Sequence, residues 1–307
     1  MADPKPYAAP AGVEAAIKDA ARAASAADPS LTINERIRIE HFRRFLSRVF
    51  SEGEESEWIL KGGTGMLARV PSTRSTLDID LYREGFTLGQ ALDDLRRLAG
   101  VDLGDHFRFV YTGHRASIGG EEQPYTDGYR VSFDVYVGAQ KKTQINIDLA
   151  IGVGVTAPVT SATPASGLAL PRLTSHPYRL YPVVDQIADK VCATMADYHG
   201  RPSSREKDLV DLVVLATTQD ISGHALQTAI AHETRLRQMG PINRFVVPSN
   251  WGRAYAKMAK SVPYCADYRT VNQAHELVAA FIDPVLSGSA SESTWTPASR
   301  TWTRNGH

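Results

Sequence analysis

The pattern of apolar and polar positions divides the chain into a helical start, a strand-rich middle and a helical remainder. Helical spacing of apolar residues or strict alternation predicts helices over 12–27, 34–50 and 87–98, strands over 106–111, 129–137 and 143–151, and helices from residue 183 onward. We therefore expect an α+β protein, in which a lobe with a mixed sheet precedes a mostly helical lobe. The expected divisions are N-terminal helices over 1–55, the sheet lobe over 56–170, the helical lobe over 171–285, and a disordered Ser-, Thr- and Gly-rich tail over 286–307. The arginines of the 34–50 helix are expected to form a solvated face.

The stretch from Trp58 to Tyr82 carries the clearest chemical signal. It predicts a strand, a Gly-Gly-Thr turn that begins a helix, and a second strand. Gly62 and Gly63 allow a tight turn and a close approach to a ligand, and Thr64 is expected to cap the helix. Because the first N–H groups of a helix attract anions, this turn predicts a phosphate site.

Two acidic residues lie on the second strand of that stretch. Side chains alternate along a strand, so Leu77, Ile79 and Leu81 are expected on one face and Asp78 and Asp80 together on the other. A single D-x-D on a strand is most often a solvated edge. Its position after a Gly-Gly-Thr turn favours a functional role instead.

A later strand repeats the same pattern. In the run Q-I-N-I-D-L-A-I, Ile145, Ile147 and Leu149 face one way, while Asn146 and Asp148 face the other. Asp148 is therefore a third carboxylate on the polar face of a strand.

Three carboxylates near a phosphate site are typical of nucleotidyl transfer, which requires charge neutralisation around phosphorus. Divalent metals held by carboxylates neutralise that charge, and Mg²⁺ or Mn²⁺ is the expected cofactor. We expect Asp78 and Asp80 to bind metal, with Asp148 completing the site and helping to deprotonate the incoming hydroxyl. The triphosphate is expected to lie on Gly63 and Thr64.

The helical lobe supplies a lysine and further acids. Lys190 has two open interpretations: it contacts a triphosphate, or it forms an ordinary ion pair with Asp211. Asp208 and Asp211 are three residues apart and share a helix face, where they could orient Lys190 or Arg205. Asp211 is favoured over Asp208, because its apolar neighbours imply burial.

Composition narrows the class of protein. The chain has 307 residues, zero formal net charge, 43% hydrophobic residues and 22% charged residues, which is ordinary for a globular protein. Two cysteines fit a reducing compartment, and no apolar run reaches the roughly 20 residues that span a bilayer. We expect a cytoplasmic protein with no membrane partner. The histidines and cysteines show no zinc-ligand spacing.

Any nucleic-acid signal must be local, because the net charge is zero. The segment 234–266 contains basic residues and no acid, interleaved with Phe245, Trp251, Tyr255 and Tyr264. Such a mixture suits an RNA surface. The predicted RNA-binding residues are Arg235, Arg237, Arg244, Arg253, Lys257 and Lys260.

Taken together, these motifs resemble a known family. Their order is K-G-G-T, R-S-T-L-D-I-D-L, I-D-L, D-Q-I-A-D-K and R-E-K-D-L-V-D-L. It is similar to that of the AbiEii-type nucleotidyltransferase toxins of type IV toxin–antitoxin systems, which include the mycobacterial MenT toxins. The resemblance covers roughly residues 56 to 220.

The resemblance implies a DNA polymerase beta-like nucleotidyltransferase lobe followed by a helical lobe. It also implies that an NTP, with a pyrimidine favoured, supplies nucleotides to the 3′ acceptor end of tRNA, which blocks aminoacylation and translation. A cognate antitoxin protein is the implied partner. The implied phosphate-binding and metal-binding residues, with those that complete the site, are Lys61, Gly63, Thr64, Asp78, Asp80, Lys190 and Asp211.

Two alternatives stay open from the residues themselves. The same chemistry could modify a protein hydroxyl or a small molecule. The chain could also be a module that binds NTP or RNA without catalysis.

Overall fold

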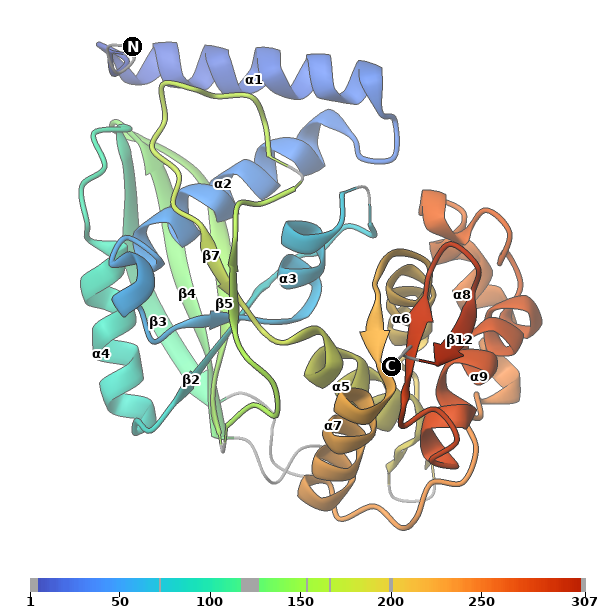
Figure 1. Ribbon diagram of the computed structural model, residues 1–307. Helices are drawn as coiled ribbons and strands as arrows, with labels where there is room; N and C mark the ends of the chain where they lie inside the picture. Colours follow the sequence, from blue (N-terminus) through green and yellow to red (C-terminus); the bar gives the residue numbers. More distant parts are fainter. Residues whose placement is uncertain are drawn as a thin grey trace. The chain divides into compact units, whose positions relative to one another are not determined.

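The chain divides into two compact units. The computed structural model describes residues 5–71, 73–116, 127–152, 154–165, 167–198 and 201–304. The first unit comprises Met1–Gly154 and Thr160–Leu180, and the second comprises Val155–Val159 and Tyr181–His307 (Figure 1). The N-terminal helices therefore belong to the same unit as the sheet, and the boundary falls after Leu180 rather than after residue 170.

A seven-stranded mixed sheet forms the centre of the first unit. The strand order is β3-β4-β5-β2-β1-β7-β6, with β2 parallel to β5 and β1 parallel to β7. The strands are β1 (Ile59–Leu60), β2 (Ile79–Glu84), β3 (Phe107–Ala116), β4 (Asp127–Val137), β5 (Gln140–Gly152), β6 (Thr160–Ala162) and β7 (Tyr178–Leu180). The predicted alternation on β5 is confirmed, because Ile145, Ile147 and Leu149 are all buried.

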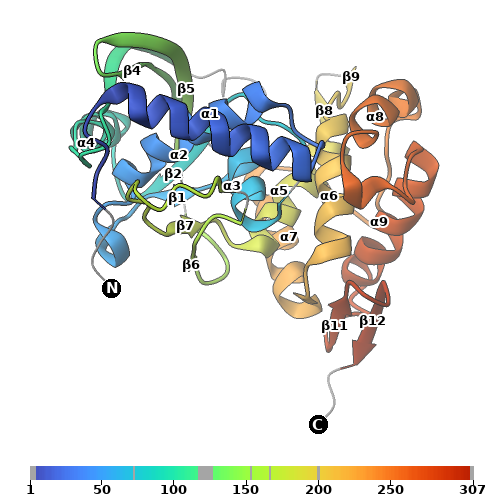
Figure 2. The ribbon, with the colours of Figure 1, turned by 90° about the horizontal axis from the view of Figure 1, so that it is seen from above.

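Helices cover the apolar face of this sheet. These helices are α1 (Pro10–Ala27), α2 (Ile33–Val49) and α4 (Leu88–Ala99). A further helix, α3 (Gly62–Arg69), lies between β1 and β2 in sequence, and a short 3₁₀ turn, η1, spans Gly53–Glu55. Both α2 and α4 begin with a capping box, at Thr32 and Thr87. Figures 1 and 2 both show α1 alongside α2. The start of α1 also contacts the β4–β5 hairpin, where Glu14 pairs with Lys142 at 2.7 Å.

The expected solvated face of α2 is a wrong prediction. Arg43, Arg44 and Arg48 are buried, and each is paired with a carboxylate. Glu40 accepts a hydrogen bond from Arg43 and forms an ion pair with Arg44 at 2.8 Å, while Arg48 lies 2.6 Å from Asp105. Buried charges persist where they are paired in this way, and a single sequence does not show where the partners lie.

The second unit is mostly helical, as predicted. Its helices are α5 (Val183–Met195), α6 (Glu206–Thr218), α7 (Gly223–Leu236), α8 (Gly252–Ala259) and α9 (Val271–Leu286), with 3₁₀ turns η2 (Ser249–Trp251) and η3 (Pro263–Cys265) and a small β8 (Asp197–Tyr198) and β9 (Arg201–Pro202) ladder. The α+β class with a mixed sheet is therefore confirmed. In the described part of the chain, no helix combines the length and the apolar character needed to cross a membrane.

The C-terminal segment differs from the predicted disordered tail over 286–307. Strands β11 (Ser293–Thr296) and β12 (Thr301–Arg304) form a hairpin that adds to β10 (Ile221–Ser222). Trp295 is buried, its Nε1 donates to the Ala216 carbonyl at 2.7 Å, and its ring packs on Phe281. Trp302 packs against Trp295, with ring centroids 5.6 Å apart. These two tryptophans supply the apolar surface of a segment that is otherwise mostly polar.

We expect Trp295→Ala to destabilise the second unit by about 3–5 kcal/mol, because it removes a buried indole and leaves the Ala216 carbonyl without its donor. Chemical denaturation followed by circular dichroism measures this change. Thr301→Ala, on the exposed side of the same hairpin, is the matched control and should change the free energy of unfolding by no more than about 0.5 kcal/mol. Equal stability of the two variants would contradict a structural role for Trp295.

Candidate active site

The Gly-Gly-Thr turn starts α3 three residues earlier than a cap at Thr64 predicts. Lys61 is the N-cap, and α3 begins at Gly62, so the prediction that Thr64 caps the helix is wrong. Thr64 lies in the first turn, and its hydroxyl donates to the backbone carbonyl of Asp78 at 2.8 Å. The side chain therefore joins the start of α3 to the start of β2.

Close packing against β2 explains the first glycine of the turn. Gly62 has a φ of +57°, and a Cβ atom there would lie 1.9 Å from Oδ2 of Asp80. The second glycine is similarly confined, since a Cβ on Gly63 would lie 2.9 Å from the Thr76 hydroxyl. The glycines thus bring the first turn of α3 against the Asp80 carboxylate, where any larger side chain would displace it.

The two acids of the D-x-D motif occupy different positions relative to β2. Asp80 lies within the strand, whereas Asp78 precedes its first residue. Ile79 and Leu81 are fully buried as predicted, but Leu77 is 67% exposed. Because the chain bends at Leu77 and Asp78, alternation does not extend to Leu77.

The structure brings Asp148 next to Asp80. Strands β2 and β5 are parallel neighbours, and Asp80 and Asp148 are register partners. Their neighbours Ile79 and Ile147 are partners as well, on the buried face. Register partners on adjacent strands share a face, so the two carboxylates lie on the sheet's polar face.

Asp78, Asp80 and Asp148 form a carboxylate cluster, and Arg130 on β4 belongs to it although the sequence did not single it out. Its guanidinium lies 2.5 Å from Asp78 and 3.0 Å from Asp148. Arg130 alternates with buried Val131, so its place on a polar strand face was readable from sequence. Its partners depend on the register between β4 and β5, which sequence spacing does not show.

The cluster perturbs the protonation of its members. Burial raises the pKa of Asp148 to about 6, and repulsion from Asp80 acts in the same direction. The hydrogen bond with Asp78 and the charge of Asp148 raise the pKa of Arg130 above its ordinary value. These shifts are expected where several carboxylates share a face and a guanidinium pairs with two of them.

A divalent cation fits the chemistry of these donors. Within the described residues, no three His, Cys, Asp or Glu side chains converge closely enough to form a metal cage alone. Mg²⁺ does not require such a cage, because one or two carboxylates usually bind it together with substrate phosphates and waters. Asp80 and Asp148 present carboxylate oxygens of this kind as register partners beside the start of α3.

Lys190 and Asp211 are brought together inside the second unit. The Lys190 ammonium lies 2.6 Å from Asp211 and 3.2 Å from Asp208, and all three side chains are buried. Although burial opposes ionisation of Asp208, attraction from Lys190 and Arg205 holds its pKa below the ordinary value. The predicted ion pair with Asp211 is therefore present, and Asp208 takes part in it as well.

The aromatic part of the predicted RNA surface is wrong for three of its four residues, since only Tyr264 is partly exposed. Phe245, Trp251 and Tyr255 are fully buried, so their rings are unavailable for stacking on bases. Arg237 is also a structural residue, since it pairs with Asp189 and Glu233. The remaining predicted basic residues are exposed and comprise Arg235, Arg244, Arg253, Lys257 and Lys260.

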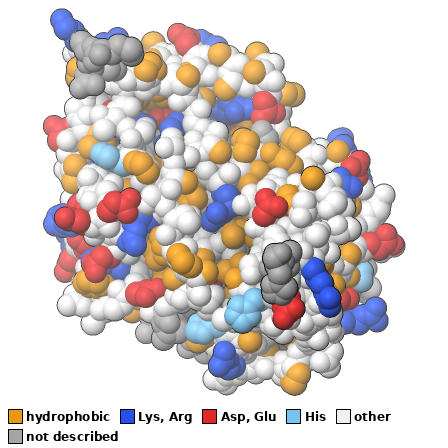
Figure 3. Space-filling view, in the orientation of Figure 1, with side chains coloured by type: hydrophobic (Ala, Val, Ile, Leu, Met, Phe, Trp, Pro, Cys, Tyr) orange, Lys and Arg blue, Asp and Glu red, His pale blue; other side chains and the backbone are white. Residues whose placement is uncertain are grey.

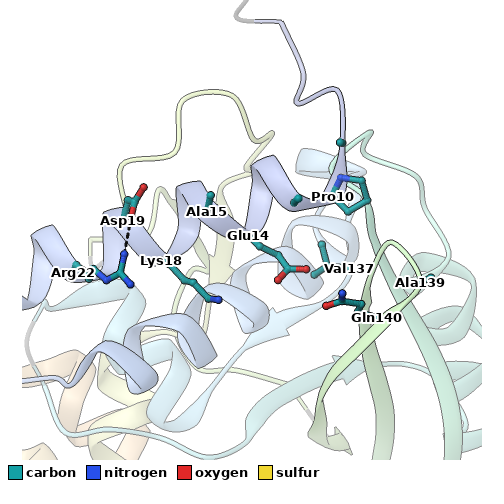
Figure 4. A pocket seen from close by; sticks show the side chains of 11 residues that line it. Pro10, Glu14, Ala15, Lys18, Asp19, Arg22, Val137, Ala139 and Gln140 are labelled. Carbon is teal, nitrogen blue, oxygen red and sulfur yellow. Dashed lines mark hydrogen bonds and ion pairs between the residues drawn. The ribbon is translucent and has the colours of Figure 1, made fainter.

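A cavity of about 610 Å³ lies elsewhere in the first unit, between α1 and the β4–β5 hairpin (Figure 4). Glu14 and Lys18 line it from α1, and Val137 and Gln140 line it from the hairpin. None of its lining residues belongs to the carboxylate cluster.

On the face in Figure 3, acidic and basic side chains are interspersed, in agreement with the zero net charge.

Comparison with known proteins identifies the family. The model of the nucleotidyl transferase AbiEii toxin family, type IV toxin–antitoxin system, matches residues 44–277. The chain belongs to the AbiEii family. The AbiEii match includes the turn, the carboxylate cluster, Arg130 and the Lys190 network, and membership implies an antitoxin partner.

Two crystal structures from Helicobacter pylori are similar to this AbiEii chain. One is JHP933 and the other is a proposed nucleotidyltransferase, and each has 15% sequence identity and a TM-score of 0.44. Each covers 82% of this chain, and the matches span 92% and 96% of the two structures. No curated protein matches this chain.

We expect Gly62→Ala to lower nucleotidyl transfer strongly, because the new methyl group would displace the Asp80 carboxylate. Gly85→Ala is the matched control, since Gly85 also has a positive φ, of +73°, but nothing within 4 Å of an added Cβ. Both variants should lose about 1–2 kcal/mol of stability from backbone strain. Thermal melts and NTP turnover separate the two effects. Equal turnover of the two variants would contradict the close contact between Gly62 and Asp80.

Proposed function

We propose that this AbiEii protein transfers a nucleoside monophosphate from an NTP to the 3′ acceptor end of tRNA, in a reaction that depends on Mg²⁺ or Mn²⁺. The modified end would not accept an amino acid, so translation would stop. A pyrimidine nucleotide is the proposed donor. The observation that supports this most strongly is the juxtaposition of Asp80 and Asp148 beside the start of α3.

The proposed metal ligands are Asp78, Asp80 and Asp148. When bound, a divalent cation supplies positive charge that stabilises the phosphoryl group under attack and the leaving pyrophosphate. The protein's own part is to hold carboxylate oxygens in fixed positions. The register of β2 with β5 does this for Asp80 and Asp148, and the Thr64 hydroxyl holds the Asp78 backbone.

The start of α3 is the proposed triphosphate site. The N–H groups of the first helical turn lack partners further back in the same helix, and the helix dipole favours an anion there. Lys61, Gly63 and Thr64 would bind the phosphates. Because the start of α3 lies against Asp80, phosphates bound there would share one site with the carboxylates.

The transfer itself is an in-line substitution at the α-phosphorus. The 3′ hydroxyl of the acceptor forms the new P–O bond, and the bond to pyrophosphate breaks. We assign Asp148 to accept the hydroxyl proton, because it lies beside Asp80 on the polar face. Lys190 and Asp211 are proposed to complete the catalytic set.

Charge rather than stacking is the proposed basis for tRNA binding by the second unit. Arg253 and Lys257 are four residues apart on α8 and exposed, and Lys260 follows at its C-cap. Exposed cations four residues apart lie along one side of a helix and can follow a phosphate backbone. Arg235 and Arg244 are the further proposed contacts.

We expect the wild-type protein to label total tRNA when it is incubated with Mg²⁺ and α-labelled CTP or UTP. Asp80→Asn should lower labelling by at least about 100-fold, the usual scale for losing a group that stabilises charge in the transition state. Asp93→Asn, an exposed aspartate on α4, is the matched control and should label like wild type. Chelation of divalent cations should abolish labelling.

The acceptor is tested in the same assay. Periodate-oxidised tRNA, which has lost its terminal hydroxyls, should not be labelled. Label on a protein or a small molecule instead of tRNA would contradict the proposed acceptor, and intact NTP with every acceptor would contradict catalysis. Induced expression should arrest growth of a host cell, whereas expression of Asp80→Asn should not.

We expect Lys190→Met to destabilise the second unit by about 3–5 kcal/mol, because it removes the buried cation that lies between the Asp208 and Asp211 carboxylates. The double variant Lys190→Met/Asp211→Leu should recover part of that stability, since Asp208 keeps Arg205. It should nevertheless stay inactive if Lys190 and Asp211 act in the reaction. Recovered labelling together with recovered stability would show that both residues are structural only.

A further inference from the structure

Four charged residues form a row across the polar face of the first unit's sheet. Arg115 on β3 is the register partner of Arg130 on β4, which is the partner of Asp148 on β5, which is the partner of Asp80 on β2. The row therefore reads two positive charges and then two negative charges across four neighbouring strands. Like charges directly opposite each other repel, so Arg115 favours the conformation in which Arg130 turns toward the carboxylates.

Arg130 connects carboxylates from two different elements. One terminal nitrogen donates to Asp78 at 2.5 Å, and the other donates to both Asp148 oxygens at 3.0 and 3.2 Å. A planar guanidinium can bridge two carboxylates in this way because its donors form a fixed fork, whereas an ammonium is a point charge. Arg130 thus offsets the repulsion that would otherwise separate Asp78 from Asp148.

The accessibility of these ion pairs distinguishes them from the structural pairs of the same unit. The side chains of Arg130, Asp78 and Asp148 are 28%, 29% and 37% exposed. By contrast, both members of the Arg48–Asp105 pair are 1% exposed. Partly exposed pairs contribute little stability and open readily, while breaking a buried pair is costly. The ion pairs of Arg130 can therefore be replaced by other partners of the same carboxylates at a small cost in free energy.

We propose that Arg130 is a positioning residue that holds Asp78 and Asp148 together and that gives way when a divalent cation binds to them. This inference rests on the proposed metal-dependent transfer and adds the group against which the cation competes. The same oxygens of Asp78 and Asp148 cannot bond fully to both a guanidinium and a metal ion. Removal of the guanidinium should therefore strengthen cation binding while it weakens the metal-free fold.

The test is direct Mn²⁺ binding by electron paramagnetic resonance, without nucleotide or tRNA. Arg130→Gln should bind Mn²⁺ roughly 2- to 30-fold more tightly than wild type, which corresponds to the loss of two partly exposed ion pairs. In a chelator, its melting temperature should fall below that of wild type, and Mn²⁺ should raise it by a larger amount. Arg130→Lys, which keeps the charge but not the fork, should have an intermediate affinity.

Lys141→Gln is the matched control for loss of one positive charge. Lys141 pairs with Asp134 across the same two strands, β5 and β4, at 2.6 Å, away from the predicted metal ligands. The Lys141→Gln variant should therefore bind Mn²⁺ with the affinity of the wild-type protein. If Arg130→Gln does not fold, Arg130→Lys against wild type still decides the question.

The outcomes separate this inference from the proposed function. Equal or weaker Mn²⁺ binding by Arg130→Gln and Arg130→Lys would overturn the competition while leaving metal-dependent transfer intact. Absence of Mn²⁺ binding in every variant would overturn both. The expected order of affinities without any labelling of tRNA would support the role of Arg130 and contradict only the proposed acceptor.

Discussion

Repulsion between carboxylates on neighbouring strands is the constraint on which the polar face of the sheet depends. The parallel register of β2 and β5 places Asp80 opposite Asp148, and the bend before β2 adds Asp78. Such an arrangement requires positive charge nearby. The guanidinium of Arg130 supplies positive charge to Asp78 and Asp148. The glycine at position 62 is a further consequence, because the Asp80 carboxylate occupies the space that a side chain would take.

The protein uses ion pairs in two physically different ways. Arg48 with Asp105, and Lys190 with Asp208 and Asp211, are buried networks in which loss of one member would leave a charge without compensation. The Arg130 pairs are partly open to solvent, so exchange of partners costs little there. Burial therefore distinguishes ion pairs whose loss is costly in free energy from ion pairs that exchange partners readily.

Membership of the AbiEii family gives this arrangement its biochemical context, a nucleotidyl transferase toxin. A carboxylate-rich face beside a helix start is what such chemistry needs, because the reaction is mainly a problem of charge around phosphorus. The second unit contributes differently. Its aromatic residues Phe245, Trp251 and Tyr255 are buried, so contact with nucleic acid through this segment would depend mainly on its exposed cations.

The sequence by itself determined the class of fold, the succession of a sheet and a helical part, and the alternation that places Asp148 on a polar strand face. Alternation on β5 and the Gly-Gly-Thr turn before an acidic strand are local patterns, and local patterns survive in a single sequence. It also indicated the pairing of Lys190 with Asp211, because a carboxylate among apolar residues needs a partner.

Only the tertiary structure decided which distant residues meet. The partners of Arg130, the burial of the arginines of α2 and the C-terminal hairpin around Trp295 all depend on strand register or on packing between remote segments. A charged or polar residue looks the same in sequence whether it is solvated or paired inside the fold. Its role is set by the free energy of burying it, and that depends on neighbours brought together only by folding.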